Sequence, residues 1–264
     1  MIPKIIHQTY FSHDLPSGLC EAVGILKVKN PHWEYRFYDD TAIIEFIKLH
    51  YDQNVLAHYD RINPKYGAAR ADLFRYLLLY QCGGIYLDIK SSASRPLDDV
   101  IRPDDSYLIS NWKNKPGEEY EGWGLHAAVM SVSGGEFQQW YIAAEPGHPF
   151  LAAVIKNVLG NIDKYHPSWH GTGKAGVLWL TGPIVYTLSI APLLKHHAHR
   201  VVESDRDLGL RYTVFNDLSH RVILRSHYTK LTESIVNVGF WKRFTARLID
   251  ALRSARNFIL RREN

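Results

Sequence analysis

Residues 68–91 read AARADLFRYLLLYQCGGIYLDIKS, and a change of periodicity within this stretch decides the fold. In its first part the apolar side chains keep helical spacing, at Ala69, Leu73, Tyr76, Leu77 and Tyr80. Gly83 and Gly84 then end the helix, because glycine adopts the backbone conformations of a helix C-terminus without strain from a Cβ atom. The next side chains alternate as in a strand, with Ile85, Leu87 and Ile89 on one face and Tyr86, Asp88 and Lys90 on the other.

Helices and strands alternate on both sides of this stretch. Strands are expected at residues 2–9, 33–38, 107–110, 127–132 and 141–144. Helices are expected at residues 16–29, 41–50 and 149–159. Beyond Arg200 the pattern weakens to short strands at 201–202, 212–215 and 222–224 and a helix from about Phe240. The alternation predicts an α/β fold with a mixed, mainly parallel sheet.

The composition favours one domain. A chain of 264 residues with 46% hydrophobic residues can bury one large core, and no linker or repeat divides it. We assign residues 1–239 to this domain and residues 240–264 to a basic C-terminal helix. The two cysteines, Cys20 and Cys82, indicate neither a disulfide framework nor a zinc site. Together with an N-terminal segment that does not resemble a signal peptide, they favour a cytoplasmic location.

The uncharged run at residues 177–194 reaches the length of a membrane span. Gly182, Pro183 and Pro192 interrupt the run, and hydroxyl side chains dilute it. We therefore interpret it as a loop followed by a buried helix that begins at Pro183.

Basic residues are concentrated at the C-terminus. Residues 240–264 contain seven Lys or Arg against two acidic residues, whereas the rest of the chain is close to neutral. No basic face is predicted on the body of the protein, which argues against nucleic-acid binding. Apolar residues of the tail form one helical stripe at Phe244, Leu248, Leu252, Ala255 and Ile259. Such a helix either packs on the domain or lies on an anionic membrane surface.

Four charged side chains flank the helix–strand junction. Ligands of open α/β sheets bind at the carboxyl ends of strands, where Asp88 and Lys90 are expected. Asp72 and Arg75, three residues apart on the preceding helix, share one flank of it. Sugar transfer from a nucleotide diphosphate needs positive charge for the departing diphosphate and carboxylates for sugar hydroxyls or a divalent cation. The alternative is a surface ion pair between Asp72 and Arg75, with Asp88 as a strand-end cap.

Five ordered segments carry a resemblance to a known family. They are residues 2–9 (IPKIIHQT), 30–40 (NPHWEYRFYDD), 69–88 (ARADLFRY followed by YQCGGIYLD), 143–150 (AAEPGHPF) and 181–183 (TGP). Together they resemble the DXD-type retaining glycosyltransferases of family 32, which include yeast initiating mannosyltransferases and bacterial capsular and O-antigen sugar transferases. The large clostridial glucosylating toxins are more remote relatives. The resemblance implies a GT-A fold, a single nucleotide-binding domain and retaining transfer from a nucleotide-sugar donor.

The resemblance also implies roles for individual residues. Catalytic roles fall to Asp72, Arg75 and Asp88, and we add Lys90 because it lies beside Asp88 in the predicted strand. Donor-binding roles fall to His7, Gln8, Thr9, Tyr86, Thr181 and Gly182, with the first three near the nucleotide base and the last two at the edge of the sugar pocket.

A divalent metal, Mn²⁺ or Mg²⁺, is implied as a cofactor, with Asp88 and the late His227 as its ligands. However, Lys90 stands where the family has its second motif aspartate. Lys90 either places its ammonium near the diphosphate and partly replaces the cation, or points outward while Asp88 holds the metal through water.

The resulting prediction is a hexosyltransferase of surface polysaccharide synthesis, either O-antigen or capsule. Its acceptor would be a lipid-linked or free oligosaccharide, and its basic tail would bind the inner face of an anionic membrane. Two alternatives remain open at this point. One is a transferase that modifies proteins, and the other, suggested by Lys90, is a nucleotide-sugar-binding module without turnover.

Overall fold

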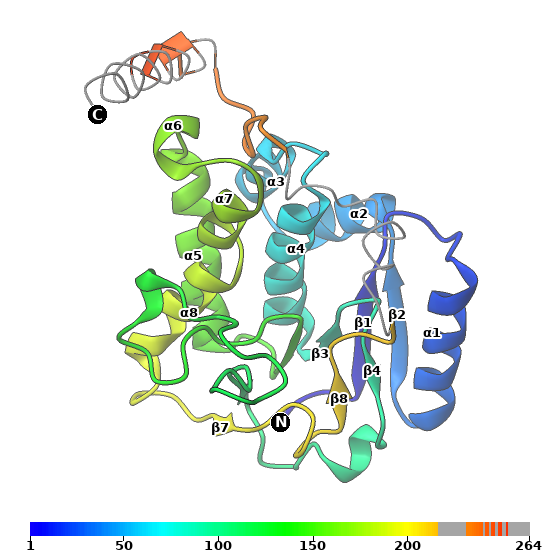
Figure 1. Ribbon diagram of the computed structural model, residues 1–264. Helices are drawn as coiled ribbons and strands as arrows, with labels where there is room; N and C mark the ends of the chain where they lie inside the picture. Colours follow the sequence, from blue (N-terminus) through cyan, green and yellow to red (C-terminus); the bar gives the residue numbers. More distant parts are fainter. Residues whose placement is uncertain (216–230, 240, 243, 246–247, 250–251, 253–264) are drawn as a thin grey trace.

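The computed structural model describes residues 1–215, 231–239, 241–242, 244–245, 248–249 and 252. A four-stranded sheet with the order β2-β1-β3-β6 lies at its centre (Figure 1). Its strands are β1 (Ile5–Thr9), β2 (Glu34–Tyr38), β3 (Gly84–Leu87) and β6 (Tyr141–Ala144). β1 is parallel to β2 and to β3, whereas β6 is antiparallel to β3. The predicted α/β fold with a mixed, mainly parallel sheet is confirmed.

Helices flank this sheet on both sides (Figure 1). On one side lies α1 (Ser17–Lys29). The opposite side carries α2 (Asp40–His50), α3 (Gln53–Arg61), α4 (Gly67–Cys82), α5 (Pro149–Lys164), α6 (Pro167–His170), α7 (Gly173–Leu180) and α8 (Pro183–Ile190). The four helices expected from periodicity before residue 160 all form, and so does the helix expected at Pro183.

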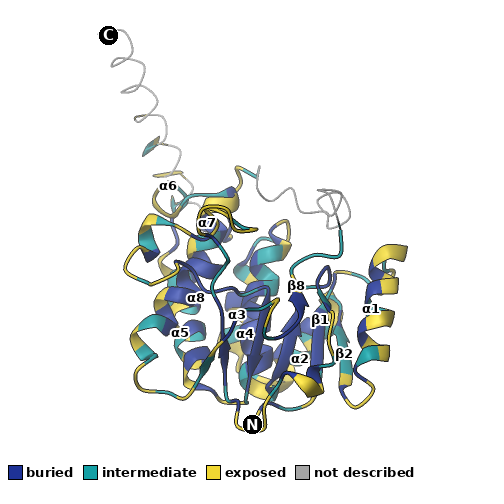
Figure 2. Ribbon diagram, turned by 60° about the horizontal axis from the view of Figure 1, so that its bottom comes forward, coloured by how far each residue is buried: buried dark blue, intermediate teal, exposed yellow. Residues whose placement is uncertain are grey.

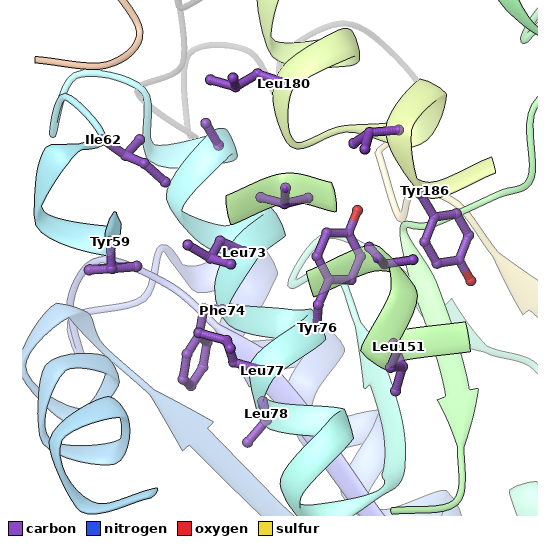
Figure 3. Close-up of a cluster of buried hydrophobic side chains, with 14 of the residues drawn as sticks. Tyr59, Ile62, Leu73, Phe74, Tyr76, Leu77, Leu78, Leu151, Leu180 and Tyr186 are labelled. Atoms are coloured by element: carbon purple, nitrogen blue, oxygen red, sulfur yellow. The ribbon is translucent and has the colours of Figure 1, made fainter. Parts of the chain in front are cut away.

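Each face of the sheet has its own hydrophobic core (Figure 2). β3 and β6 are fully buried, whereas β2, at the edge of the sheet, is mostly half-buried. On the α4 side, Tyr86 and Ile142 pack with helix residues, ten of which are labelled in Figure 3. On the other face, Ile85 and Leu87 of the same strand pack with Ile6. The predicted alternation is therefore correct for the first residues of β3, and it fixes which face of the strand meets α4.

Several short elements differ from the prediction. Residues 127–132 are not a strand but a 3₁₀ turn, η2 (Ala127–Val129), after which Met130 is 81% exposed. The apolar run there has one well-buried member, Val129, and no neighbouring strand to pair with. β5 (Leu108–Ile109) and β7 (Arg200–Val201) form where short strands are expected, and the two strands pair with each other. β8 (Leu210–Arg211), rather than residues 212–215, pairs with β4 (Ser92–Ala93). Residues 222–224 lie outside the described residues.

The uncharged run near residue 180 belongs to the core. Residues Gly173–Leu193 are long and apolar enough to cross a membrane, but 67% of the most apolar window is buried inside the domain. The run is divided at Thr181 and Gly182 into α7 and α8, followed by the short η3 (Ala191–Leu193). The expectation of a loop before Pro183 is therefore wrong, because residues 177–180 belong to helix α7. Packing inside the domain thus explains its composition.

The described residues of the tail are helical. Lys242 Nζ donates hydrogen bonds to the carbonyl oxygens of Asp163 and Tyr165, each at 3.2 Å, where α5 ends. The positive charge of a lysine at this position interacts favourably with the negative, C-terminal end of the α5 dipole. The apolar stripe behaves differently, because Leu248 and Leu252 are 53% and 63% exposed. These two stripe residues therefore lie outside the domain core.

Candidate active site

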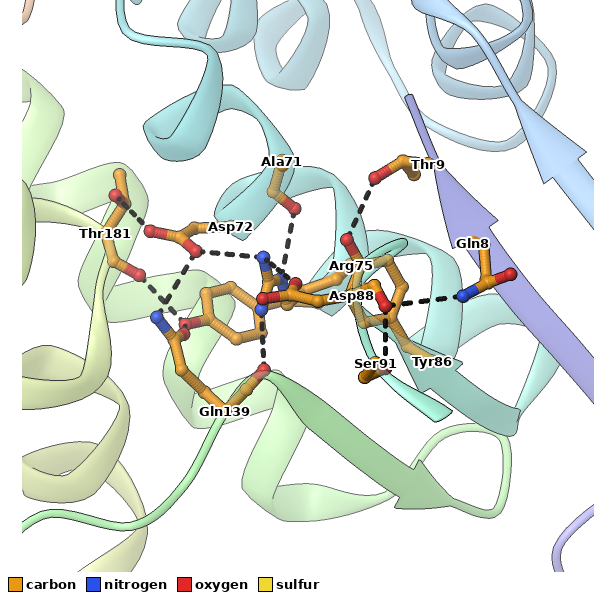
Figure 4. A network of polar contacts seen from close by, with 11 residues as sticks. Gln8, Thr9, Ala71, Asp72, Arg75, Tyr86, Asp88, Ser91, Gln139 and Thr181 are labelled. Atoms are coloured by element: carbon orange, nitrogen blue, oxygen red, sulfur yellow. Dashed lines mark hydrogen bonds and ion pairs between the residues drawn. The ribbon is translucent and has the colours of Figure 1, made fainter. Parts of the chain in front are cut away.

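Arg75 is the centre of a polar network at the carboxyl end of β3 (Figure 4). Its Nη2 lies 3.3 Å from Asp72 Oδ1 and 3.1 Å from Asp88 Oδ1. Its Nη1 donates to the carbonyl oxygen of Gln139 at 2.6 Å, and its guanidinium carbon lies 4.5 Å from the centroid of the Tyr86 ring. Because the guanidinium is a planar fork of donors, one side chain ties α4 to β3 and to the segment before β6.

The charge of Arg75 is secured by its neighbours. Burial by itself would lower the pKa of Arg75, but Tyr86, Asp88 and Asp72 together raise it above its usual range. Burial also raises the pKa of Tyr86 to about 12, and its hydroxyl shares a hydrogen bond of 2.9 Å with Thr9 Oγ1. Arg75 is therefore a permanent cation enclosed by acidic and aromatic groups.

Asp72 is the enclosed carboxyl group of the network. Its Oδ2 accepts a hydrogen bond from Thr181 Oγ1 at 3.0 Å, and its Oδ1 accepts one from Gln139 Nε2 at 3.3 Å. Burial raises the pKa of Asp72 to about 7, although Arg75 and Thr181 act in the opposite direction. The alternative of a surface ion pair with Arg75 is wrong, because both side chains are about 95% buried.

Asp88 is the more accessible carboxylate, with 25% of its side chain exposed. β3 ends at Leu87, and residues 88–91 form a turn in which Ser91 donates from N and from Oγ to the carbonyl oxygen of Asp88, at 2.8 and 2.6 Å. The amide of Asp88 donates to the carbonyl oxygen of Trp140 at 2.8 Å. The expectation that the strand continues to Lys90 is therefore wrong, and the turn directs Asp88 and Lys90 to different partners.

Lys90 lies against an aromatic ring on the other side of this turn. Its Nζ is 3.8 Å from the centroid of Tyr212, and the residue is 7% exposed. Burial lowers the pKa of Lys90, while Asp88 raises it. Within the described part of the chain no ion pair joins Lys90 to Asp88. A lysine that points outward into solvent, one of the two alternatives, is excluded by this burial.

His7 is an internal residue. Its Nδ1 lies 3.2 Å from the hydroxyl of Tyr38, and its Nε2 lies 3.0 Å from the carbonyl oxygen of Gly83. Burial lowers its pKa to about 4, so the imidazole is neutral at pH 7. The close packing of β1 and the His7 ring against residue 84 requires glycine there. Its φ is +96°, and a Cβ atom would lie 2.6 Å from the carbonyl oxygen of Ile5. Contact between His7 and a nucleotide base stays a prediction, since both ring nitrogens already have protein neighbours.

Gln8 and Thr9 connect β1 to the site. Gln8 Nε2 donates to the carbonyl oxygen of Asp88 at 3.3 Å, and its Oε1 accepts from the hydroxyl of Tyr35 at 3.0 Å. Thr9 is half-buried and contacts Tyr86. β1 therefore supports the Asp88 turn directly, and the roles of both residues in donor binding remain predictions.

Thr181 and Gly182 join the network at the α7–α8 junction. Thr181 is fully buried, and its carbonyl oxygen accepts a hydrogen bond from the hydroxyl of Tyr76 at 2.9 Å. Gly182 precedes α8, and a Cβ atom there would lie 2.9 Å from the Cα of Leu178. The structure thus brings Thr181 to Asp72, whereas Gly182 permits the close approach of two helices. Contact of either residue with the donor sugar is still a prediction.

The described residues do not form a metal site by themselves. No group of three or more His, Cys, Asp or Glu side chains is present among them. Asp88 Oδ1 is paired with Arg75, and the second motif position carries the buried Lys90. His227, the other predicted ligand, lies outside the described residues. We therefore derive no step through a metal ion.

Sequence reasoning missed Gln139 and the polar role of Tyr76. Gln139 bonds Asp72 through its amide and Arg75 through its carbonyl oxygen, and its Oε1 accepts a hydrogen bond from the Tyr76 hydroxyl. Tyr76 was assigned to the apolar stripe of α4 because of its spacing, and its ring does lie in the core. Gln139 precedes β6, and the antiparallel pairing of β6 with β3 places Gln139 at the same end of the sheet as Asp88. No periodicity in the sequence indicates that pairing.

Comparison with known proteins finds that part of the chain is similar to one family. Residues 16–108 match the family described as glycosyltransferase sugar-binding region containing DXD motif. The chain is 37% identical over 183 residues to a mannosyl phosphorylinositol ceramide synthase of Saccharomyces cerevisiae, which covers 69% of this chain and 41% of that protein. The chain is thus similar to the DXD-motif glycosyltransferases over residues 16–108. It lacks the second aspartate of that motif, as Lys90 shows.

Other relatives of this chain are named as mannosyltransferases. Inositol phosphoceramide mannosyltransferase 3 of Schizosaccharomyces pombe is 29% identical over 187 residues, which cover 71% of this chain and 44% of that protein. The initiation-specific alpha-1,6-mannosyltransferase of Candida albicans is 30% identical over 174 residues, covering 60% and 43%. The chain thus spans less than half the length of these three relatives.

Solved structures confirm the GT-A fold of this glycosyltransferase. The UDP-bound glycosyltransferase domain of the YGT toxin aligns with a TM-score of 0.53 at 10% identity and covers 81% of each chain. The PaToxG glycosyltransferase aligns with a TM-score of 0.51 at 16% identity, covering 74% of this chain and 70% of that one. At such identities the likeness concerns the fold alone.

Proposed function

We propose that this chain transfers a hexose from a nucleotide diphosphate sugar to a saccharide hydroxyl, with retention of the anomeric configuration. The observation that supports the proposal is the buried Arg75, which holds Asp88 at the carboxyl end of β3. Open α/β sheets bind their ligands at this edge. Similarity to the family supplies the reaction class, and the position of Asp88 supplies a carboxylate that a ligand can reach.

The network divides the work between contact and positioning. Asp88 is the group that would accept a hydrogen bond from a donor hydroxyl, because part of its carboxylate is exposed. Arg75 and Asp72 are positioning residues, since their polar atoms are occupied by one another, Asp88 and Gln139. When the glycosidic C–O bond breaks, its electron pair goes to the diphosphate oxygen. The ammonium of Lys90 would then stabilise the added negative charge.

Mannose is the first donor sugar to test, because the relatives are named mannosyltransferases. For the acceptor we propose an oligosaccharide of surface polysaccharide synthesis, either lipid-linked or free. The competing acceptor class is inositol phosphoceramide, which appears in the name of one relative and, as phosphorylinositol ceramide, in the name of another. An acceptor panel that contains both classes, with each nucleotide diphosphate hexose in turn, distinguishes them by the mass of the product.

Thermal unfolding with nucleotides tests the donor half of the proposal. A ligand that binds only the folded state at one hundred times its Kd adds about 2.7 kcal/mol of stability. We expect such a shift with one family of nucleotide diphosphate hexoses and little with the free hexose. Proton NMR of the product should then show the anomeric configuration of the donor. If no nucleotide shifts the unfolding transition, the proposal is wrong.

Lys90 favours one alternative, a nucleotide-sugar-binding module without turnover. A binder of this kind would show the thermal shift but would neither transfer the sugar nor release it by hydrolysis. Prolonged incubation of the protein with the bound donor, followed by measurement of free nucleotide diphosphate, separates the two. Release above the rate seen without protein excludes the pure binder.

We also propose that the C-terminal tail attaches the protein to the inner face of an anionic membrane. Seven Lys or Arg residues in the tail and the exposure of Leu248 and Leu252 support this. Each basic residue near an anionic surface contributes about 1 kcal/mol. We expect co-sedimentation with vesicles that contain phosphatidylserine, which weakens as salt is added.

Charge reversal at Arg247, Arg253 and Arg256 to Glu should release the protein from these vesicles. Reversal at Lys4 and Lys65, two exposed lysines of the domain, is the matched control and should leave sedimentation unchanged. Equal sedimentation of the tail variant and the parent would contradict the membrane proposal.

A further inference from the structure

A cavity of about 620 Å³ lies on the Lys90 side of the Asp88 turn. One wall comes from the loop that contains Trp112 and Tyr120, and the other comes from residues 204–215. Its size falls in the range of about 300–1,000 Å³ that is usual for small-molecule sites. Neither the family motif nor the Arg75 network includes these residues.

Several aromatic side chains are among the residues that line the cavity. The Tyr212 ring lies 5.2 Å from that of Trp112 and 5.7 Å from that of Trp140, in edge-to-face geometry. Tyr120 lies 4.9 Å from Trp112 and completes the group. Edge-to-face packing holds the rings in fixed orientations, so their surfaces are preorganised.

The polar rim of the cavity has no net charge. The charged residues that line it in the described part of the chain are two bases and two acids, Lys113, Arg211, Glu119 and Asp205. Lys113 Nζ lies 2.6 Å from Asp205 Oδ2, and this pair connects the two walls. A nucleotide diphosphate carries at least two negative charges and would need excess positive charge here. An uncharged ligand with several hydroxyl groups fits the rim better.

Two contacts connect the cavity to the candidate active site. The carbonyl oxygen of Trp140 accepts the hydrogen bond from the Asp88 amide, while the Trp140 ring packs against Tyr212. In the second contact, the Lys90 ammonium lies over the ring of Tyr212, which lines the cavity. A ligand in the cavity would therefore be next to Trp140, which is hydrogen-bonded to Asp88, and to Tyr212, which contacts Lys90.

We infer that this cavity is the binding site for the acceptor saccharide, an inference that rests on the proposed hexosyl transfer. The C–H face of a pyranose ring packs against the electron-rich face of an aromatic ring, and its hydroxyls need both donors and acceptors at the rim. The aromatic faces come from Trp112, Tyr120 and Tyr212. The hydrogen-bonding groups at the rim come from Lys113 and Asp205. The donor sugar then occupies the Asp88 side of the turn, and the acceptor occupies the Lys90 side.

Binding of soluble glycosides tests the inference without any turnover. Methyl glycosides of the common hexoses and mannobiose serve as probes, measured by saturation-transfer NMR in the absence of donor. We expect at least one probe to bind the parent, and Trp112→Leu to weaken that binding about tenfold. Tyr120→Leu is a second variant from the same wall, in case Trp112→Leu does not fold. In the transfer assay the same changes should raise the acceptor KM, while the donor Kd from thermal shift stays within about twofold.

Trp169→Leu is the matched control. Trp169 is 69% exposed, belongs to α6, packs against His166 and does not line the cavity, so glycoside binding should be unchanged. Trp112→Phe keeps a ring on the wall and should retain most of the affinity lost in Trp112→Leu.

Three results would overturn the inference. They are the failure of every probe to bind the parent, an equal loss in Trp169→Leu, and a weakening of donor rather than glycoside binding in Trp112→Leu. The last result would assign the cavity to the donor. If the parent binds glycosides here but neither binds nor cleaves any donor, the proposed function fails while the cavity remains a saccharide site.

Discussion

The two sides of the turn at residues 88–91 differ in how their charges are satisfied. On the Asp88 side, Arg75 contacts two carboxylates and a carbonyl oxygen, and Asp72 accepts from Thr181 and Gln139. On the Lys90 side, the ammonium has an aromatic face as its described partner. A saturated network of this kind holds its members in one geometry, whereas an ammonium on a ring can exchange that contact for a phosphate oxygen. The comparison indicates a rigid half that positions groups and an adaptable half that responds to ligands.

The strongest test of the rigid half is Arg75→Met, which keeps the volume and removes the charge. The variant leaves Asp72 and Asp88 without their shared cation, and breaking a buried pair in this way costs about 3–5 kcal/mol. We expect a loss of this size in the free energy of unfolding, measured with urea. Adding Asp72→Asn should recover part of the loss, because it removes the uncompensated buried carboxyl group. A stability equal to that of the parent would mean that the network is not rigid.

The pH dependence of stability tests the burial of Asp72. Its native pKa is raised to about 7 by burial, above the value of about 3.9 in unfolded chains. Between these values the native state holds a proton that the unfolded state has released, so stability falls as pH rises and levels off above pH 7. Three pKa units correspond to at most about 4 kcal/mol.

His7 acts in the opposite direction in part of this window. Its native pKa is lowered to about 4, so its contribution to stability is lost as pH falls from about 6.5. The informative quantity is therefore the free energy of unfolding of the parent minus that of Asp72→Asn. This difference should decrease from pH 4 to pH 7. Parallel stability curves for the two proteins would show that Asp72 is ionised throughout.

Asp88→Asn tests which carboxylate the reaction uses. We expect kcat for transfer to fall at least a hundredfold, roughly 3 kcal/mol of transition-state stabilisation, with the fold retained. Asp163→Asn is the matched control, since Asp163 is also paired with an arginine, Arg61 at 2.6 Å, but is 57% exposed and belongs to α5. Near-normal turnover by a folded Asp88→Asn protein would remove Asp88 from the mechanism.

The same comparison explains what the sequence could predict. Asp72, Arg75 and Asp88 come from one helix–strand unit, so helical spacing and the glycine pair were enough to bring them together. Gln139 and Trp140 join them only through the antiparallel pairing of β6 with β3. Periodicity contains no information on that register, and both residues were missed.

The Lys90 side was less predictable for a physical reason. Alternation along β3 predicts that Lys90 shares a face with Asp88, but alternation ends where the backbone leaves the strand, and Ser91 closes a turn instead. The partner of Lys90, Tyr212, lies more than a hundred residues away, beside a two-residue strand. α3 was likewise not predicted, although Asp52 caps it by accepting a hydrogen bond from the amide of Val55 at 3.0 Å.

The adaptable half is tested by changing Lys90 while leaving Asp88 in place. If the ammonium leaves Tyr212 to contact the diphosphate, Lys90→Ala should weaken donor binding about tenfold, which corresponds to about 1.4 kcal/mol. Lys90→Arg keeps the charge and should lose less, although a planar guanidinium does not match the compact ammonium. Both variants should keep the unfolding behaviour of the parent more closely than Arg75→Met does. Donor affinities equal to that of the parent in both would place Lys90 in the aromatic wall alone. A chelator titration completes the comparison: activity that survives it would show that the lysine takes the place of a cation, and activity that divalent metal restores would show that Asp88 holds one together with the donor phosphates.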